Sequence, residues 1–190
     1  MWERLFKNFS RFVVLSDEEQ DIVKSLFKEK RYRRKQFILQ EGEVSRYESF
    51  IVKGCTRTYE VDEKGQEHVV YFGPEDWWVG DLYSFLSGKP SAYNIDCLED
   101  CIALQISKSS LETLYEKVPK TERFFRILVQ NAFIAAQNRI ASALKKTAAE
   151  RYNEFMEKYP HIARRVPDHQ IASFLGIAPQ SLSRLRKKGV

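Results

Sequence analysis

The chain has 190 residues, of which 43% are hydrophobic and 30% charged, a balance that is typical of a globular protein and excludes a disordered one. It contains no run of about 18 apolar residues, so the sequence predicts no membrane span. The N-terminal residues lack the apolar core of a secretion signal, and we expect a cytoplasmic protein.

The N-terminal part of the chain predicts a helical segment followed by a series of short strands. Residues 1–30 have helical character, with a start signal at Ser16–Glu19 ahead of an apolar stripe. Residues 31–106 then change to short apolar runs, separated by glycines or charged turns at intervals of roughly ten residues. This spacing predicts a small β-barrel or sandwich, with a hairpin turn at Asp62–Gly65.

From Ser109 the pattern is helical again, and residues 121–159 keep apolar side chains at helical spacing. This stretch is too long for an average globular helix. Either the helix breaks near Gln137–Asn138, or it protrudes and packs against a second copy of itself. Burial of one face against the chain's own barrel is the alternative to a dimer. The predicted dimer seam consists of Phe125, Leu128, Ala132, Phe133, Ala136 and Ile140.

The most informative segment is residues 167–188, which predicts two short helices joined by a glycine turn. Gly176 can adopt the left-handed conformation that ends the first helix, and Pro179 suits the first turn of the second. Gln and Arg side chains can pair with the edges of DNA bases, whereas Lys and Ser suit phosphate oxygens. The predicted DNA-binding residues are Pro179, Gln180, Ser181, Ser183, Arg184, Lys187 and Lys188.

The charge distribution supports a nucleic-acid-binding C-terminal end. Residues 138–190 hold eleven Lys and Arg against four Asp and Glu, whereas the remaining 137 residues hold twenty against twenty-two. The basic excess therefore coincides with the predicted helical pair. An ordinary helical hairpin with a solvated basic end is the alternative interpretation.

Three segments together resemble the Crp/Fnr family of bacterial transcription regulators, over essentially the whole chain. Residues 37–54 are similar to the opening strands of a cyclic-nucleotide-binding domain, residues 79–88 to its phosphate-binding cassette, and residues 171–184 to the family's DNA-reading unit. The resemblance implies an α+β fold with an N-terminal β-roll (a double-stranded β-helix), a long dimerisation helix and a C-terminal helix-turn-helix. The implied domains are a sensor domain over residues 1–120, a dimerisation helix and hinge over 121–137, and a DNA-binding domain over 138–190.

The resemblance implies a homodimeric transcription regulator that reads a two-fold-symmetric site on double-stranded DNA, under the control of a small effector in the roll. RNA polymerase is a further candidate partner. The alternative is a sensor or interaction module that does not read DNA sequence. The outward positions of Gln180, Ser181 and Arg184 favour DNA, because a protein-binding hairpin would more often present apolar anchors there.

The predicted effector pocket departs from the family's pattern. Nucleotide-binding members carry Gly-Glu in the cassette and an Arg just ahead of Ser/Thr-Ala, whereas this chain has Gly80–Asp81 and Lys89–Ala92. Lys lacks the bidentate geometry of Arg, so we expect no cyclic nucleotide, and an empty or side-chain-filled roll is favoured. The implied pocket residues are Val79, Gly80, Asp81, Leu82, Lys89, Ser91 and Ala92. The aromatic residues expected to line or fill the pocket are Trp77, Trp78, Tyr83 and Tyr93.

The sequence argues against a metal centre, a haem, an iron–sulfur cluster and catalysis. Cys55, Cys97 and Cys101 are predicted to be buried thiols, and iron–sulfur sensing would need four thiolates. His68 is the one histidine in the predicted roll, which is too few for a cupin-like metal enzyme. The sequence has no P-loop, dinucleotide signature or Ser–His–Asp arrangement. We therefore expect a protein that is not an enzyme and has no catalytic residue, metal site or cofactor.

Overall fold

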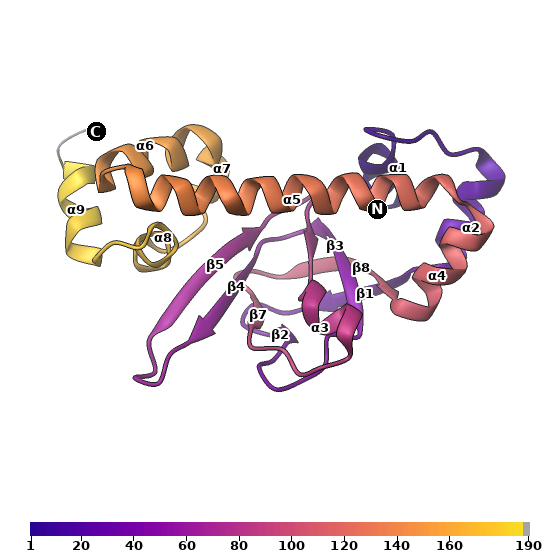
Figure 1. The fold of residues 1–190 in the computed structure, drawn as a ribbon, viewed down its shortest axis with the longest axis horizontal. Helices are drawn as coiled ribbons and strands as arrows, with labels where there is room; N and C mark the ends of the chain where they lie inside the picture. The colour runs from indigo at the N-terminus through magenta and orange to yellow at the C-terminus, as the bar shows by residue number, and fades with distance from the viewer. Residues whose placement is uncertain (188–190) are drawn as a thin grey trace.

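Antiparallel β-structure forms the centre of the molecule, and helices lie at both of its ends (Figure 1). The computed structural model describes residues 1–187. The N-terminal helices and the strands are α1 (Trp2–Phe9), α2 (Asp17–Leu26), β1 (Lys28–Tyr32), β2 (Phe37–Leu39), β3 (Tyr47–Lys53), β4 (Thr56–Val61), β5 (Glu67–Gly73), β6 (Trp78–Val79), α3 (Leu82–Ser87), β7 (Asn94–Cys97) and β8 (Cys101–Ser107). The C-terminal helices are α4 (Lys108–Lys117), α5 (Lys120–Lys145), α6 (Ala148–Lys158), α7 (Pro160–Ala163), α8 (Asp168–Leu175) and α9 (Pro179–Lys187).

Within residues 1–187 the strands form two four-stranded sheets, in the orders β1-β8-β3-β6 and β2-β7-β4-β5. Side chains alternate between the two faces of a strand. The buried residues of the first sheet therefore belong to two different hydrophobic clusters, one on each face. Phe50 and Leu104, which pair across β3 and β8, face the N-terminal helices, whereas the next pair, Ile51 and Ala103, belongs to a different cluster with Tyr71 of the second sheet. The predicted β-roll is confirmed.

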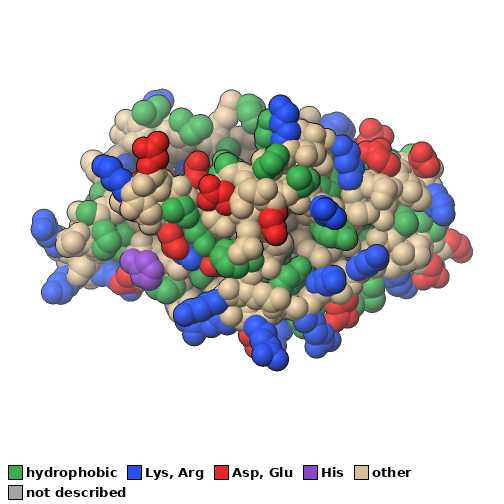
Figure 2. Space-filling model, turned by 90° about the horizontal axis from the view of Figure 1, so that it is seen from below, with side chains coloured by type: hydrophobic (Ala, Val, Ile, Leu, Met, Phe, Trp, Pro, Cys, Tyr) green, Lys and Arg blue, Asp and Glu red, His purple; other side chains and the backbone are tan. Residues whose placement is uncertain are grey.

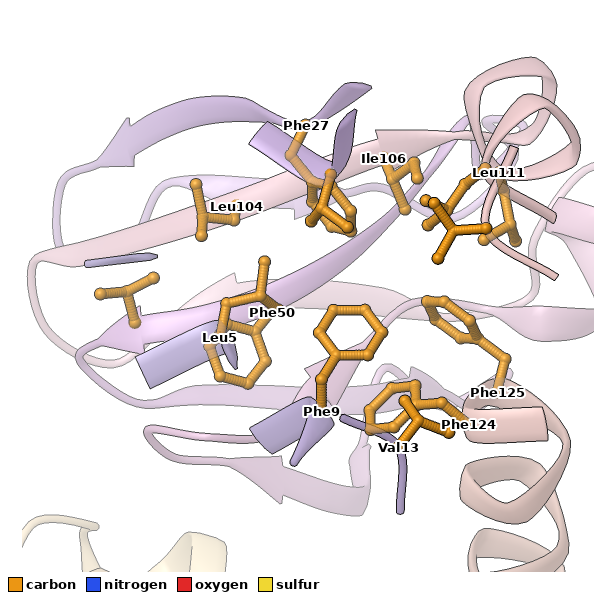
Figure 3. Close-up of a cluster of buried hydrophobic side chains, with 14 of the residues drawn as sticks. Leu5, Phe9, Val13, Phe27, Phe50, Leu104, Ile106, Leu111, Phe124 and Phe125 are labelled. Carbon is orange, nitrogen blue, oxygen red and sulfur yellow. The ribbon is translucent and has the colours of Figure 1, made fainter. Parts of the chain in front are cut away.

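The largest hydrophobic cluster lies between the first sheet and helices α1, α2, α4 and α5 (Figure 3). Phe9 of α1 and Phe124 of α5 are both fully buried, and their ring centroids are 4.3 Å apart. Each such ring contributes roughly 1.5–3 kcal/mol when it is removed from water. This cluster therefore fixes the first turns of α5 against the roll.

A second hydrophobic cluster joins the second sheet to the C-terminal helices. Phe72 of β5 packs against Phe174 of α8, with ring centroids 5.4 Å apart, and Phe155 of α6 lies 5.5 Å from the same ring. The C-terminal helices are thus packed against the roll of their own chain.

Two features of the fold differ from the sequence-based expectations. Residues 28–30, expected within the N-terminal helical segment, instead form the first part of β1, because every residue of this strand pairs with a residue of β8. Of the two alternatives for the long helix, a break near Gln137–Asn138 is wrong, since α5 continues to Lys145. The chain breaks at Thr147 instead, whose side chain forms a capping box with Glu150 at the start of α6.

Candidate nucleic-acid interface and effector pocket

Helices α8 and α9 are joined by the tight turn that the sequence predicted. Gly176 ends α8 with φ of +64°, in the left-handed region that favours glycine. The amide of Ile177 donates to the carbonyl of Ala172 at 3.0 Å, which closes the helix end. Pro179 is the first residue of α9. Ala172 and Leu182 are fully buried where the two helices meet.

The predicted DNA-binding residues of α9 that the structure describes lie largely on its exposed side. Gln180, Ser183, Arg184 and Lys187 are exposed, and their spacing of three and four residues places them on one face of the helix. Pro179 is also exposed and Ser181 is half-buried, while Lys188 lies outside the described residues. The face of α9 opposite Leu182 is therefore available to a ligand.

One further cation of α9 forms an ion pair with the neighbouring helix α8. Arg186 forms an ion pair with Asp168 at the start of α8, with Nη1 and Oδ1 2.8 Å apart. This pair is partly exposed, so its contribution to stability is small. It links the C-terminal part of α9 to the N-terminus of α8.

The helix-turn-helix unit contacts the roll through polar groups as well as rings. The Oγ of Ser173 accepts from the amide of Val69 at 2.9 Å and donates to the carbonyl of Glu67 at 2.9 Å. Arg165 donates to both carboxylate oxygens of Glu75, at 2.8 and 2.9 Å, and also contacts the carboxylate of Glu99. These contacts place α8 against β5 and leave α9 at the end of the molecule (Figure 1).

Helix α5 presents apolar side chains to solvent over its middle and C-terminal turns. Phe133 is 62% exposed, Ile140 61% and Leu144 82%, and residues 129–141 are all exposed. Of the predicted seam, Ala132, Phe133, Ala136 and Ile140 are free to contact a second chain. Phe125 and Leu128 are not, because they pack in the first hydrophobic cluster of their own chain.

The predicted effector pocket surrounds the N-terminus of α3. Asp81 caps this helix, and its Oδ1 accepts from the amides of Tyr83 at 3.0 Å and Ser84 at 3.2 Å. An anion bound at a helix N-terminus needs such amides as donors. The chain's own carboxylate therefore takes the donors that a phosphate would require.

Two buried serines of this region are also bonded within the chain. The buried Oγ of Ser84 accepts from the amide of Ser45 at 2.9 Å and donates to the carbonyl of Lys89 at 2.6 Å. Ser91 is buried, and its amide donates to the carbonyl of Glu43. Of the other predicted pocket residues, Val79 is buried, whereas Leu82, Lys89 and Ala92 are exposed. The hydroxyl of Ser84 and the amide of Ser91 are thus bonded within the chain and are not free to bind an anion.

A second carboxyl group, which the sequence analysis missed, lies behind this pocket. The stem of Glu48 is partly exposed, but its carboxyl is buried, and among residues 1–187 its Oε1 has no hydrogen-bond partner. Both oxygens of this carboxyl lie 2.6 Å from where a Cβ on Gly80 would be, so any side chain at position 80 would displace the Glu48 carboxyl. Burial, followed by the negative charge of Asp81, raises the pKa of Glu48 to about 8.

The aromatic lining expected for the pocket is wrong in part. Trp78 packs in the first hydrophobic cluster, and its Nε1 donates to Oδ1 of Asn8 at 3.1 Å. Trp77 lies against Tyr159 of α6, with ring centroids 6.0 Å apart. Tyr83 is 61% exposed on α3. Alternation along β6 explains the position of Trp78, because its neighbour Val79 points to the opposite face and joins the small cluster inside the roll.

Cys55, Cys97 and Cys101 are buried free thiols, as predicted. Over residues 1–187, no cluster of three or more His, Cys, Asp or Glu is arranged to hold a metal ion. None of the helices in the same range is long and apolar enough to cross a membrane.

Comparison with known families identifies the roll. Residues 29–118 match the family model of the cyclic nucleotide-binding domain. These residues belong to the cyclic nucleotide-binding domain family. No curated protein matches the chain in sequence.

Solved structures extend the likeness beyond the cyclic nucleotide-binding domain. FixK2 from Bradyrhizobium japonicum has a TM-score of 0.76 at 21% identity, over 85% of this chain and 83% of that chain. The regulator CLP from Xanthomonas campestris has a TM-score of 0.74 at 12% identity, over 91% of each chain. The catabolite activator protein of Thermus thermophilus has a TM-score of 0.61 at 18% identity, over 93% and 84%. The predicted Crp/Fnr fold is thus confirmed.

The residues of this cyclic nucleotide-binding domain do not fit a cyclic nucleotide. A buried phosphate needs a fixed positive partner or several free donors. Here the amides at the start of α3 are bonded to Asp81, Lys89 is exposed, and the Glu48 carboxyl lies against Gly80. A phosphate would have to displace the Asp81 carboxylate from these amides.

We therefore expect cAMP or cGMP at about 1 mM to leave the Tm of the protein unchanged within about 1 °C. A ligand at 100 times its Kd would stabilise the fold by about 2.7 kcal/mol and raise the Tm by roughly 5–10 °C. Thermal unfolding followed by circular dichroism measures this, with AMP as the matched control. A rise of several degrees with a cyclic nucleotide but not with AMP would contradict the expectation.

Proposed function

We propose that the chain is a DNA-binding transcription regulator that binds a two-fold-symmetric site as a homodimer. The observation that carries the proposal is the exposed face of α9, on which Gln180, Ser183, Arg184 and Lys187 lie together. In a helix-turn-helix the second helix enters the major groove. We assign Arg184 and Gln180 to base edges, and Ser181, Ser183 and Lys187 to phosphates, with Pro179 at the start of the helix.

The exposed apolar face of α5 supports the dimer. Ala132, Phe133, Ala136 and Ile140 recur at helical spacing on a stretch that buries little in its own chain, and a second copy of α5 would cover it. Two α9 helices related by a two-fold axis would enter successive major grooves about 34 Å apart. In this proposal residues 1–120 form the sensor domain and residues 138–190 the DNA-binding domain. The dimerisation helix, expected over residues 121–137, extends through α5 to Lys145.

The structural relatives give the proposal its context. CLP is described as a c-di-GMP-responsive global regulator, and the Thermus thermophilus protein as a catabolite activator. A bacterial transcription regulator works in the cytoplasm with RNA polymerase, and we propose both for this chain. Because the pocket does not fit a cyclic nucleotide, the chemistry of any effector stays open, and the proposed function is not catalytic.

The direct test is selection of bound duplexes from a random pool by the ligand-free protein, near 0.15 M salt. Enrichment of a palindromic sequence would support a dimer that reads DNA without an effector. If no sequence is enriched and binding stays sequence-independent, the proposal is wrong. The chain would then be better described as a sensor or interaction module.

On the selected site, Arg184→Ala is expected to weaken binding by about 1–3 kcal/mol and to relax the preference at one position of each half-site. Lys187→Ala is the matched control on the same helix face, because a phosphate contact weakens all sequences alike and lowers the salt slope by about 1. Fluorescence anisotropy on matched and mismatched duplexes measures both. Equal effects of Arg184→Ala on matched and mismatched duplexes would argue against the assigned base contact.

A further inference from the structure

A dense group of positive charges lies in the roll, far along the chain from α9. Residues 28–35 contain six Lys and Arg and one Glu, a net charge of +5 that equals the formal net charge of the whole chain. We call these residues the basic strand. The other residues before Asn138 then carry a net charge of −7. The basic strand is therefore a concentrated positive segment within an otherwise acidic half of the protein.

The cations of the basic strand are exposed and mostly lack acidic partners. Apart from the half-buried Tyr32, every residue from 28 to 35 is exposed. Arg31 pairs with Glu29, with Nε and Oε1 2.8 Å apart. The other five cations form no ion pair with any residue of the described range 1–187. They are Lys28, Lys30, Arg33, Arg34 and Lys35.

The backbone that carries these charges is fixed by the fold. Residues 28–32 pair with β8 along β1, the outer strand of the first sheet. The amide of Arg34 donates to Oδ1 of Asp100 at 2.9 Å, and the amide of Lys35 donates to the carbonyl of Cys97 at 2.6 Å. Lys35 has φ of +67°, in the left-handed region. The charges are thus presented on an ordered backbone.

The chemistry of the basic strand fits a polyanion better than a protein surface. Protein interfaces are centred on buried aromatic and apolar anchors, whereas the aromatic residue of this segment, Tyr32, packs into the small cluster inside the roll. Lys28 and Lys30 lie two residues apart on one strand, about 6.6 Å at the usual rise. Duplex DNA presents one negative charge per 1.7 Å or so of its axis. A row of unpaired cations at this spacing suits such a backbone.

We propose that the basic strand binds the phosphate backbone of DNA that flanks the site bound by α9. This inference rests on the proposed function and adds a second, sequence-independent contact to it. Lys and Arg side chains occupy the lower edge of the view in Figure 2 well beyond the end that carries α9, so positive charge is not confined to the helix-turn-helix.

The distance between the two contacts sets the length of DNA that is needed. Helix α5 runs from the first hydrophobic cluster to the C-terminal helices and has 26 residues, about 39 Å of helix, which we take as the scale of the separation between the two contacts. At about 3.4 Å per base pair this corresponds to roughly 11 base pairs of duplex. A duplex limited to the two half-sites would therefore not reach the basic strand, whereas one with long flanks would.

The test compares a duplex of about 24 base pairs holding only the selected site with one of about 60 base pairs holding the same site at its centre. For the unmodified protein we expect the longer duplex to bind at least about tenfold more tightly near 0.15 M salt. Its plot of log Kobs against log salt should be steeper by about 0.9 for each additional phosphate neutralised. Both differences should vanish in the variant Lys28→Gln, Lys30→Gln, Arg33→Gln, Arg34→Gln. Lys35 is kept because of its left-handed backbone.

The matched control removes four exposed cations elsewhere, in the variant Lys7→Gln, Arg11→Gln, Lys117→Gln, Arg123→Gln, and should keep the dependence on duplex length. Lys28→Gln with Lys30→Gln alone should remove part of it and guards against a folding defect in the fourfold variant. The inference is overturned if the fourfold variant keeps the full length dependence, or if it loses affinity equally on both duplexes.

Two further outcomes have distinct meanings. Charged side chains also protect outer strands from pairing with other chains, so a fourfold variant that aggregates but keeps the length dependence overturns the DNA contact. If the fourfold variant bound both duplexes as tightly as the unmodified protein, the DNA contact would also be overturned, and an acidic protein would become the expected partner of the basic strand. Failure of the proposed function is recognised separately, because the unmodified protein would then show no preference for the 24-base-pair site over a scrambled duplex.

Discussion

Phe133→Asp is expected to convert the protein from a dimer into a monomer and to lower its affinity for a two-half-site duplex by about 100-fold or more. Phe133 is 62% exposed in the single chain, and its burial in a seam would contribute roughly 1.5–3 kcal/mol per ring. A carboxylate at the same position would be buried without a partner, which costs more than the ring contributes. Loss of the second α9 removes the avidity of bivalent binding.

Sedimentation velocity gives the oligomeric state of this variant, and anisotropy gives its DNA affinity. Asn131→Asp is the matched control, because Asn131 is exposed and lies on nearly the opposite face of α5 from Phe133. It introduces the same charge but should leave the dimer intact. A Phe133→Asp protein that remains dimeric at micromolar concentration would show that the seam lies elsewhere.

Glu48→Gln is expected to stabilise the protein at alkaline pH and to flatten its pH dependence. Burial, and then the charge of Asp81, raise the pKa of Glu48 to about 8 in the fold, against 4.5 for an ordinary glutamate. Between these two values the unfolded chain loses the proton while the folded chain keeps it. The free energy of unfolding therefore falls as the pH rises from about 4.5 to 8, by up to about 1.4 kcal/mol per pH unit.

A glutamine at position 48 cannot ionise, so this loss disappears. At pH 8–9 the variant should be more stable than the unmodified protein by an amount on the order of 2–4 kcal/mol, less the cost of burying an amide. Urea unfolding at several pH values between 5 and 9 measures the difference. The control variant is Glu116→Gln, at an exposed position of α4. Its free energy of unfolding should have the same pH dependence as that of the unmodified protein. If the free energy of unfolding of Glu48→Gln also followed the same pH dependence as that of the unmodified protein, Glu48 would be ionised in the fold.

The parts of the fold governed by local rules could be predicted from the sequence. Gly176 and Pro179 mark a helix end and a helix start by their own backbone preferences, and the turn lies where they predict it. The end of α5 was also present in the sequence as Thr147 followed by Glu150, a capping box. Apolar periodicity continues on both sides of Thr147 and concealed that signal, so one of the two alternatives placed the break about nine residues too early.

The parts governed by pairing between distant strands could not be predicted. Glu48 is buried because β6 brings Gly80 beside it, and nothing in the local sequence around Glu48 indicates this contact. Phe125 has the same helical spacing as Phe133, yet one is buried in its own core and the other exposed. The charge count over residues 1–137 averaged the basic strand with its acidic surroundings, and so concealed it.

The contact between Ser173 and β5 has a consequence for the roll as a separate unit. Strand β5 is the outer strand of the second sheet, and the Ser173 hydroxyl occupies an amide and a carbonyl of its free edge. A fragment that ended at Lys145 would leave that edge open beside the uncovered rings of Tyr59 and Phe72, the kind of surface on which chains aggregate. Transfer of this roll to another protein would therefore require another segment to cover the edge of β5 and these rings. We expect a chain without the C-terminal helices to be poorly soluble, in addition to losing the proposed DNA-binding unit.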